Sequence, residues 1–301
     1  MVASSSRALS RWAGIVLLML VATTFGANHI AARIAFDHGA NVTTGVAFRS
    51  TGTALFVLGL LLFYRIPLKI PRRTFGHAVF IGLLLTVQSY CLYSAVARIP
   101  VALALLAFNT YPMLLSLLSW AAGGERPARR ALAAMPVALV GLAIALDVWG
   151  KSGDFAGRWG EIGAGVLWAT GAAVSFAAVL FLTTKWLHDM DGRLRSFLTT
   201  SVIAVVILAY GAATGDFRVA TDATGWIATA ALTIFYGTAI TSMFVLLPRL
   251  GAVNNAVVLN FEPIALLGLG WVILDQKVAP IQIVGAFIVV GAIMVLGLGR
   301  K

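Results

Sequence analysis

The stretch RIPVALALLAFNTYPMLLSLLSW, residues 98–120, aligns with RLGAVNNAVVLNFEPIALLGLGW, residues 249–271, at a constant offset of 151 positions. Four chemically distinct positions coincide: Arg98 with Arg249, Asn109 with Asn260, Pro112 with Pro263, and Trp120 with Trp271. Helices rich in Leu, Ala and Gly align easily with one another, but apolar bias does not produce shared Arg, Asn, Pro and Trp positions. The chain therefore contains an internal repeat.

Weaker matches extend this repeat towards both ends of the chain. At the same offset of 151, Gly14 pairs with Gly165 and Phe25 with Phe176, and at an offset of 146 Arg49-Ser50 pairs with Arg195-Ser196. A one-residue gap then aligns Glu125 with Asp275 and Val140-Gly141 with Val290-Gly291. We therefore divide the chain into a first half, residues 1–150, and a second half, residues 151–301.

The composition places both halves in a lipid bilayer. Of the 301 residues, 60% are hydrophobic and 11% are charged, whereas about 25% of residues are charged in a typical soluble domain. This number of charged residues is too small to form the water-facing surface of a soluble globular protein. The net charge of +11 does not indicate nucleic-acid binding, because the basic residues stand in short segments between apolar runs and form no patch with interleaved aromatics.

Ten apolar runs are long enough to be membrane-spanning helices, which need about 20 mostly apolar residues. They are predicted at residues 12–33, 42–64, 75–97, 100–121, 130–149, 160–184, 197–214, 225–247, 252–274 and 279–298. The first run resembles a secretory signal peptide, but it continues past Phe25 and nine further runs follow. The sequence thus predicts an all-α polytopic membrane protein with ten transmembrane helices.

The distribution of basic residues predicts the orientation. Ten spans put both termini on one side, where fifteen Lys and Arg residues lie, against six on the other side, with Arg49 inside the second span. Because cytoplasmic loops are enriched in Lys and Arg, we expect both termini in the cytoplasm. Each half has five spans, an odd number, so the second half enters the membrane in the opposite direction. Inverted repeats of this kind are common in secondary transporters, which bind substrate near the midplane.

Polar residues inside the predicted spans indicate a central cavity, because such residues are costly in lipid and usually face the bundle interior or water. The fifth and tenth spans contain none over residues 131–146 and 283–297, so we expect them to face lipid or form an interface. The candidate cavity residues come from the first, third, fourth, sixth, eighth and ninth spans: Thr24, Asn28, His29, Gln88, Tyr90, Tyr93, Asn109, Tyr111, Trp168, Ser175, Tyr236, Thr241, Asn260 and Glu262. Each of them alone also fits core packing.

Two prolines lie near the middle of equivalent spans, Pro112 in the fourth and Pro263 in the ninth. A proline inside a helix removes one backbone hydrogen bond and frees the carbonyl one turn upstream, here that of Phe108 or Leu259. Such a break is tolerated in a membrane where it is buried in protein or lines a cavity. We therefore predict a pair of kinks, one in each half, that face the central path.

Glu262 is the one carboxylate in an otherwise nearly apolar run. It has three interpretations: a proton-titrating coupling site, a charge or hydrogen-bond partner for a substrate, or a structural carboxyl bonded to neighbouring helices. Its repeat mate is Tyr111, so the symmetry of the repeat does not require a carboxylate. Arg49, inside the second span, either reaches towards the interface or pairs within the protein.

Enzyme chemistry is not indicated. The single cysteine, Cys91, allows no internal disulfide, and no Cys/His cluster indicates a metal, so we expect no cofactor. A membrane-embedded acyl or prenyl transferase needs clustered Asp, His or Arg residues at the interface. The eleven acidic residues are scattered and form no DxxD or HxxxxD pair, which argues against such an enzyme.

These features together resemble the EamA-type drug/metabolite transporters over essentially the whole chain. The resemblance rests on the ten spans, the inverted repeats, a Phe25-Gly26 turn in the first span, the Asn-x-x-Pro of the fourth span, Glu262-Pro263, and the helix ends at Gly124-Glu125 and Leu274-Asp275. Two positions depart from the family pattern. The first-span motif usually begins with Trp where this chain has Phe25, and the ninth span ends in Asp275 instead of the commoner Glu.

The resemblance implies export of small metabolites across the bacterial inner membrane, often amino acids or their analogues. The aromatic cavity residues are similar to those of the aromatic amino acid exporter subgroup. We expect alternating access around a midplane site, an amino-acid-like substrate, a surrounding lipid bilayer, no nucleic-acid partner, and a monomer or homodimer. The alternatives are a proton-coupled antiporter that uses Glu262 and, from a different class, the membrane-embedded transferase.

Overall fold

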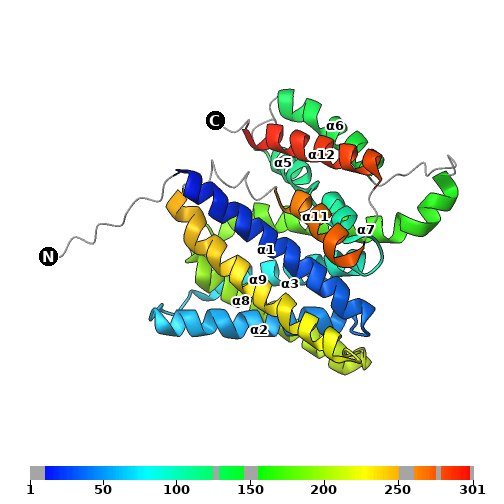
Figure 1. The fold of residues 1–301 in the computed structure, drawn as a ribbon. Coiled ribbons are helices and arrows are strands. Elements are labelled where there is room, and N and C mark those ends of the chain that lie inside the picture. The colour runs from blue at the N-terminus through cyan, green and yellow to red at the C-terminus, as the bar shows by residue number, and fades with distance from the viewer. Residues whose placement is uncertain (1–10, 125–128, 146–154, 251–260, 276–278, 299–301) are drawn as a thin grey trace.

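The structure is a computed structural model that describes residues 11–124, 129–145, 155–250, 261–275 and 279–298. These residues form helices joined by short connections, and no strand occurs among them (Figure 1). The helices are α1 (Arg11–Asp37), α2 (Val42–Phe63), α3 (Arg72–Val96), α4 (Val101–Phe108), α5 (Tyr111–Ala121), α6 (Arg129–Ala145), α7 (Phe155–Trp186), α8 (Gly192–Thr214), α9 (Ala223–Leu250), α11 (Glu262–Leu274) and α12 (Pro280–Leu298).

The helices coincide with the predicted spans, and the all-α prediction is confirmed. Within the described residues, seven segments are long and apolar enough to cross a membrane: Val16–Asp37, Val42–Phe63, Arg72–Val96, Val101–Ala121, Ile162–Trp186, Gly192–Thr214 and Ala223–Ile240. At the fifth, ninth and tenth predicted spans the described residues contain shorter apolar helices: Pro136–Ala145, Ala265–Leu274 and Pro280–Ala292. The count of ten crossings therefore stays a prediction.

Helices from the two halves pack against each other in a pattern that follows the repeat. The first helix of the first half, α1, packs along α9, and its counterpart α7 packs along α3. The helices α2 and α8, which are counterparts, pack on each other, and so do α6 and α12. This exchange interlocks the two halves into one bundle.

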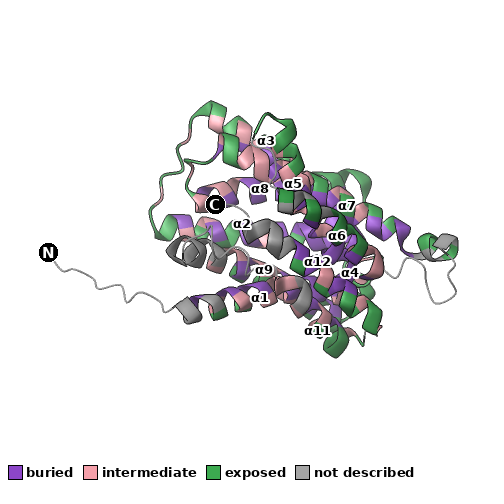
Figure 2. Cartoon of the chain, turned by 90° about the horizontal axis from the view of Figure 1, so that it is seen from above, coloured by how far each residue is buried: buried purple, intermediate pink, exposed green. Residues whose placement is uncertain are grey.

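Buried and exposed positions alternate along most helices (Figure 2), and large apolar side chains occur at both kinds of position. The largest buried cluster joins α3, α4 and α7 and includes Leu92, Leu105 and Ala169. Many large apolar side chains face outward instead, among them Phe63 and Val272, which are 79% and 72% exposed. A soluble monomer rarely exposes contiguous apolar surface on this scale, so the outer surface suits a bilayer.

The pair of α6 and α12 lies together at one edge of the bundle (Figure 1). A Cβ atom added to Gly285 would meet the backbone of Ala145 and would lie 2.6 Å from the carbonyl oxygen of Gly141. Only glycine permits this close approach of two backbones, as in the small-residue contacts of membrane helices. The two spans that carry no polar groups thus bury small residues against each other.

The fourth span is interrupted at Asn109 and Thr110. Here α4 ends at Phe108, and α5 begins at Tyr111 with Pro112 in its first turn. At this position a proline costs no intrahelical hydrogen bond, since the N–H would have no partner. The predicted break is present in the fourth span, and Pro112 lies in the first turn of the segment that follows it.

The ninth span has the same arrangement in its described part. Pro263 lies in the first turn of α11, which begins at Glu262. The predicted free carbonyl of Leu259 and the repeated Asn260 lie outside the described residues. The two prolines that align in the sequence therefore occupy the same position in their helices.

The predicted turn at Phe25-Gly26 is wrong, because α1 runs through both residues without interruption. Gly26 serves helix packing instead: an added Cβ atom would lie 3.2 Å from Cγ of Leu266 on α11. The predicted helix end at Leu274-Asp275 is confirmed. There α11 ends at Leu274, and Asp275 follows in the left-handed region with a φ of 50°.

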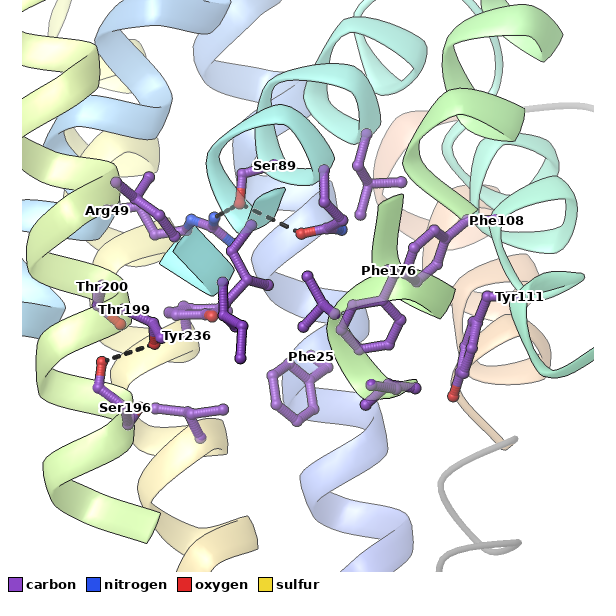
Figure 3. A pocket seen from close by; sticks show the side chains of 18 of the residues that line it. Phe25, Arg49, Ser89, Phe108, Tyr111, Phe176, Ser196, Thr199, Thr200 and Tyr236 are labelled. Carbon is purple, nitrogen blue, oxygen red and sulfur yellow. Dashed lines mark hydrogen bonds between the residues drawn. The ribbon is translucent and has the colours of Figure 1, made fainter. Parts of the chain in front are cut away.

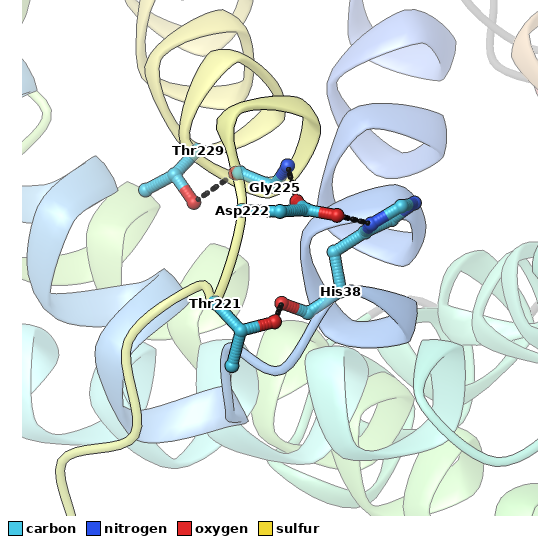
Figure 4. Close-up of polar contacts among 5 residues, drawn as sticks. All are labelled: His38, Thr221, Asp222, Gly225 and Thr229. Carbon is cyan, nitrogen blue, oxygen red and sulfur yellow. Dashed lines mark hydrogen bonds and ion pairs between the residues drawn. The ribbon is translucent and has the colours of Figure 1, made fainter.

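Two connections, α1–α2 and α8–α9, are joined on one side of the bundle (Figure 4). The amide and the hydroxyl of Thr221 donate to the carbonyl of His38 at 2.9 and 3.1 Å. The His38 Nδ1 atom lies 2.7 Å from Oδ2 of Asp222, whose other oxygen accepts from the Gly225 amide at 2.8 Å. The Gly225 amide, and then His38, hold the pKa of Asp222 below its usual value.

The same two connections meet again around Asp216. The side-chain amide of Asn41 donates to Oδ1 and to the carbonyl of Asp216, both at 2.9 Å, and Thr43 donates to Oδ2 at 2.7 Å. The backbone amide of Asn41 donates to the carbonyl of Arg218 at 3.0 Å. We call this network, residues 38–43 with residues 216–222, the connection clamp. It ties the first half to the second on that side of the bundle.

Candidate functional site

A cavity of about 340 Å³ lies among helices of both halves (Figure 3). This volume is at the lower end of the range for small-molecule pockets, roughly 300–1,000 Å³. None of the described residues of α6 or α12 lines it, as the lack of polar groups in those spans predicted. The polar side chains in the wall are His29, Arg49, Gln88, Ser89, Asn109, Tyr111, Thr183, Arg195, Ser196, Thr199, Thr200, Tyr236 and Glu262.

The cavity extends towards the α7–α8 connection. Leu61, at the end of α2, packs in one cluster with Met190 and Leu194, so this connection lies at the opposite end of α2 from the connection clamp. The lining residues Thr183 and Arg195 near the α7–α8 connection are partly exposed.

The cavity is closed at the end that carries the connection clamp. Its lining residues near that end, Leu92 and Leu105, are only 4% and 1% exposed. The clamp ties the connections of the two halves together on the same side. Thr183 and Arg195 are thus more exposed than Leu92 and Leu105, and we call the end of the cavity near the α7–α8 connection the open end and the end near the clamp the closed end.

Aromatic rings form one wall of the cavity, to one side of Figure 3. The ring centroids of Phe108, Tyr111 and Phe176 lie 4.8–5.4 Å apart from one another. Phe25, the repeat mate of Phe176, contacts Tyr236 at 6.1 Å. We call Phe25, Phe108, Tyr111 and Phe176 the aromatic wall. Its ring faces and edges suit an apolar or aromatic group of a ligand.

Arg49 is buried on the inward face of α2, together with Val46 and Ser50, and only 5% of its surface is exposed. Its guanidinium carbon lies 4.2 Å from the ring centroid of Tyr236 and 4.8 Å from that of Tyr93, which is cation–π geometry. One terminal nitrogen donates to Oγ of Ser89 at 2.8 Å, and the buried Nε has no hydrogen-bond partner. Arg49 thus pairs within the protein and does not reach the interface.

Glu262 and His29 meet at the cavity wall. The two side chains are 19% and 7% exposed, and 3.5 Å separates Oε1 of Glu262 from Nε2 of His29. As the first residue of α11, Glu262 also lies where the helix dipole favours a carboxylate. The contact with His29 fits a structural carboxyl, and the exposure to the cavity fits a role with substrate or protons, so the three interpretations stay open.

Tyr93 and Asn28 form a buried pair outside the cavity wall, and the ring of Tyr93 packs against Arg49 and His29. Tyr93 and Asn28 are both fully buried, and the hydroxyl of Tyr93 donates to Oδ1 of Asn28 at 3.0 Å. One face of Tyr93 lies against Arg49, and its ring centroid is 5.6 Å from that of His29. The pair therefore orients two residues of the wall without lining it.

The predicted site residues divide into three groups in the structure. Those in the cavity wall are His29, Gln88, Asn109, Tyr111, Tyr236 and Glu262. Those outside the wall are Thr24, which donates to the carbonyl of Leu20, the buried pair Asn28 and Tyr93, the ring pair Tyr90 and Trp168, and Ser175. The side chain of Thr241 and all of Asn260 lie outside the described residues.

The sequence analysis missed the contribution of the second and seventh spans. The structure adds Arg49 of α2 at one end of the cavity, beside Ser89 of the third span, and a polar face of α8 at the other, formed by Arg195, Ser196, Thr199 and Thr200. The hydroxyl of Thr199 bonds back to the carbonyl of Arg195 at 2.9 Å. The repeat match of Arg49-Ser50 with Arg195-Ser196 was the signal that marks both helices.

Comparison with known proteins gives one family and a shared fold. A solved structure described as "Crystal structure of protein" is similar over 97% of this chain and 98% of that chain, with a TM-score of 0.65 and 18% identity, which shows the fold alone. None of the curated proteins matches the chain. The model of the EamA-like transporter family matches residues 12–146 and again residues 163–298. Since these two copies cover most of both halves, the chain belongs to the EamA-like transporter family.

Proposed function

We propose that the protein exports amino-acid-like metabolites by alternating access around the cavity. The observation that carries this proposal is the cavity itself, which lies between the two repeats and combines aromatic rings with hydrogen-bonding groups. In transporters built from repeats, substrate binds near the midplane where the repeats meet. Membership of a transporter family supports the same function.

The distribution of basic residues supports the direction of transport. The excess of Lys and Arg on the side of the termini favours cytoplasmic termini, and the family resemblance implies a bacterial inner membrane. With that orientation, ten crossings and a division at residues 150 and 151, the open end of the cavity faces the cytoplasm. The connection clamp then closes the outer side, and the structure corresponds to the state that loads substrate for export.

The chemistry of the wall favours a neutral amino acid with an apolar or aromatic side chain. The aromatic wall offers a surface to an apolar group. Charged and polar side chains of Arg49, His29 and Glu262 lie in the same cavity and suit a polar head group. An amino acid carries both parts on one small molecule.

Uptake into liposomes tests the proposal. Purified protein is reconstituted, and a panel of labelled amino acids is measured with and without a pH gradient. We expect saturable uptake of at least one of them above protein-free liposomes. Thr199→Trp fills the cavity and should abolish uptake, whereas Thr214→Trp, at the exposed end of α8, should retain it. Absence of saturable uptake, or equal uptake by the two Trp variants, would contradict the proposal.

Proton-coupled antiport is a second candidate. The contact of 3.5 Å between His29 and Glu262 favours it, because both groups titrate and both lie in the cavity wall. The pH gradient in the same experiment separates the two functions. Concentrative uptake that requires the gradient supports antiport, and equal uptake with and without it supports transport without proton coupling.

A further inference from the structure

We propose that the transported molecule is a carboxylate, which Arg195 receives at the open end of the cavity and Arg49 holds at the closed end. The proposal rests on transport through this cavity and adds the chemical class of the substrate and the two residues that recognise it. Four observations support it: the repeat relation of the two arginines, the absence of an ion pair to either of them among the described residues, the fixed position of Arg49, and the aromatic wall that lines the same cavity.

The repeat places one arginine towards each end of a single path. Arg49 and Arg195 are repeat mates, and both line the cavity. The helix α2 starts at the connection clamp, whereas α8 ends there, so the two helices run in opposite directions and pack on each other. Arg49 lies in the second turn of α2, near the closed end, and Arg195 lies in the first turn of α8, near the open end.

Neither arginine forms an ion pair in the described part of the chain, although Asp191, four residues before Arg195, interacts electrostatically with Arg195. The ion pairs found there join His29 to Glu262, Arg33 to Asp37, and other pairs at the surface, and none includes Arg49 or Arg195. Arginine keeps its charge inside proteins, and a charge removed from water is costly unless it is paired. The Tyr93 and Tyr236 rings and Ser89 compensate only in part, because the buried Nε of Arg49 has no acceptor.

The guanidinium of Arg49 is held in one orientation before any ligand binds. Tyr236 and Tyr93 lie 4.2 and 4.8 Å from it, and the hydrogen bond to Ser89 fixes one terminal nitrogen. A group fixed in advance loses little freedom when it binds. A guanidinium forms strong hydrogen bonds with a carboxylate, so a carboxylate in the cavity supplies the missing negative charge.

The cavity wall around Arg49 selects carboxylates with an apolar group. The aromatic wall and Arg49 line the same 340 Å³ cavity, so one small molecule can contact both. Glu262 lies in the wall as well and suits the ammonium of an amino acid, whereas a carboxylic acid without an amine leaves Glu262 to His29. An amino acid and a carboxylic acid without an amine share the carboxylate, and the experiment below distinguishes these two classes of substrate.

A matched series of competitors tests the proposal on the wild-type protein. Uptake of labelled L-phenylalanine, or of the amino acid that the panel shows to be transported best, is measured against L-phenylalanine, L-phenylalaninamide and 3-phenylpropanoate. We expect the amide to compete about tenfold or more weakly than the acid, since it lacks the charged hydrogen bonds. An amide that competes as well as the acid would overturn the carboxylate while leaving transport intact. Equal competition by 3-phenylpropanoate assigns recognition to the carboxylate alone, and weaker competition adds the amine.

Variants assign the roles of the two arginines. Arg49→Gln should remove the preference for acid over amide, and Arg49→Lys should retain part of it, because the charge stays but the fork of donors is lost. Arg195→Gln should lower uptake at low substrate concentration and weaken its dependence on ionic strength, with the preference intact. Arg98→Gln is the matched control, because Arg98 stacks on Trp168 outside the cavity wall. An unchanged preference in Arg49→Gln would overturn the assignment to Arg49.

A binding measurement keeps the proposal testable if transport fails. The midpoint of thermal unfolding of the detergent-purified wild type is measured with 3-phenylpropanoate and with 3-phenylpropanamide. A rise with the acid alone supports the carboxylate site, even where no amino acid in the panel is transported and the proposed function is wrong. Equal midpoints with the acid and the amide would overturn the carboxylate site, whatever the outcome of the transport assay.

Discussion

Glu262 stands at the start of α11, 3.5 Å from His29 and in the wall of a cavity that is open at one end. A coupling carboxylate has to lose and regain its proton in every cycle. Its repeat mate is Tyr111, which also lines the cavity, so the symmetric scaffold works with a neutral group at the equivalent position. We therefore expect Glu262→Gln, which keeps the size and an acceptor, to retain substrate-saturable transport.

The measurement compares Glu262→Gln with the wild type in liposomes, with and without an imposed pH gradient. The rate of the variant should depend no more on the gradient than the wild-type rate does. If Gln abolishes gradient-driven transport but leaves substrate exchange at equal pH, Glu262 is the coupling site, and the antiporter replaces the mechanism proposed above.

The break between α4 and α5, within the fourth span, can be tested directly by substitution. Two side chains stabilise the end of α4: Asn109 donates to the carbonyl of Leu105 at 2.7 Å, and Thr110 donates to that of Ala107 at 2.8 Å. Pro112→Ala restores an N–H that can continue the helix. We expect slower transport with normal membrane insertion, and a larger effect in the double variant Pro112→Ala/Pro263→Ala, because both halves then lose the break.

Initial uptake rates and the amount of inserted protein check this prediction together. The hydrogen bonds of Asn109 and Thr110 still favour the break after the single substitution, so the single variant should lose only part of its rate. Wild-type rates in the double variant, at normal expression, would remove the break from the mechanism.

The crossing of α6 and α12 is predicted to contribute to stability and not to transport. Gly285→Ala places a methyl group against the backbone of Ala145 and Gly141, and overpacking of this kind costs about 1–3 kcal/mol. Gly291→Ala on the same helix is the matched control, because an added Cβ atom there meets nothing within 4 Å. We expect a lower midpoint of thermal unfolding for Gly285→Ala alone. Equal midpoints for the two variants would contradict the close crossing.

Conservative changes on the outer face of the same pair should leave transport near normal. Leu139, on α6, is 55% exposed and lies outside the cavity wall, so Leu139→Ile changes neither the helix crossing nor the path. Uptake rates in liposomes check this. A strong loss of transport in well-folded Leu139→Ile would place this face of α6 at an essential contact.

For the molecule as a whole, we predict that the connection clamp sets the equilibrium between the state open on the clamp side and the state open towards the α7–α8 connection. Asp216→Ala removes the carboxylate that accepts from the Asn41 and Thr43 side chains and leaves Asn41 only the backbone carbonyl of residue 216. Hydrogen bonds to a charged group each contribute about 1.5–3 kcal/mol when protected from water. Because these bonds are partly exposed, we expect a shift of up to about tenfold towards a state open on the clamp side.

Labelling of a cysteine in the cavity measures that shift. In a Cys91→Ala background, Gln88→Cys places a thiol in the wall, and a membrane-impermeant maleimide is added on the side of the clamp. Asp216→Ala should speed the labelling. The control is Asp189→Ala, which removes the exposed contact of His188 with Asp189 in the α7–α8 connection and should leave the labelling unchanged. Equal labelling rates with and without Asp216→Ala would show that the clamp does not hold this end closed.

The sequence by itself determined the features that depend on neighbouring residues along the chain. The length of each apolar run placed the helices, because a bilayer requires a fixed length of apolar surface. Pro112 placed the break in the fourth span, since proline has no N–H to continue a helix. The alignment of residues 98–120 with residues 249–271 revealed the repeat, and the family matches in both halves agree with it.

The tertiary structure alone decided which side chains meet. Arg49 and Arg195 reach the cavity, while the rings of Tyr90 and Trp168, which were also predicted to line it, meet edge to face outside its wall. Gly26 accommodates Leu266 of α11 where the motif suggested a turn. The rotation of each helix about its axis decides which of its side chains face the cavity and which face a neighbouring helix. Packing against the other half of the chain sets that rotation, and the partner residues stand far away in the sequence.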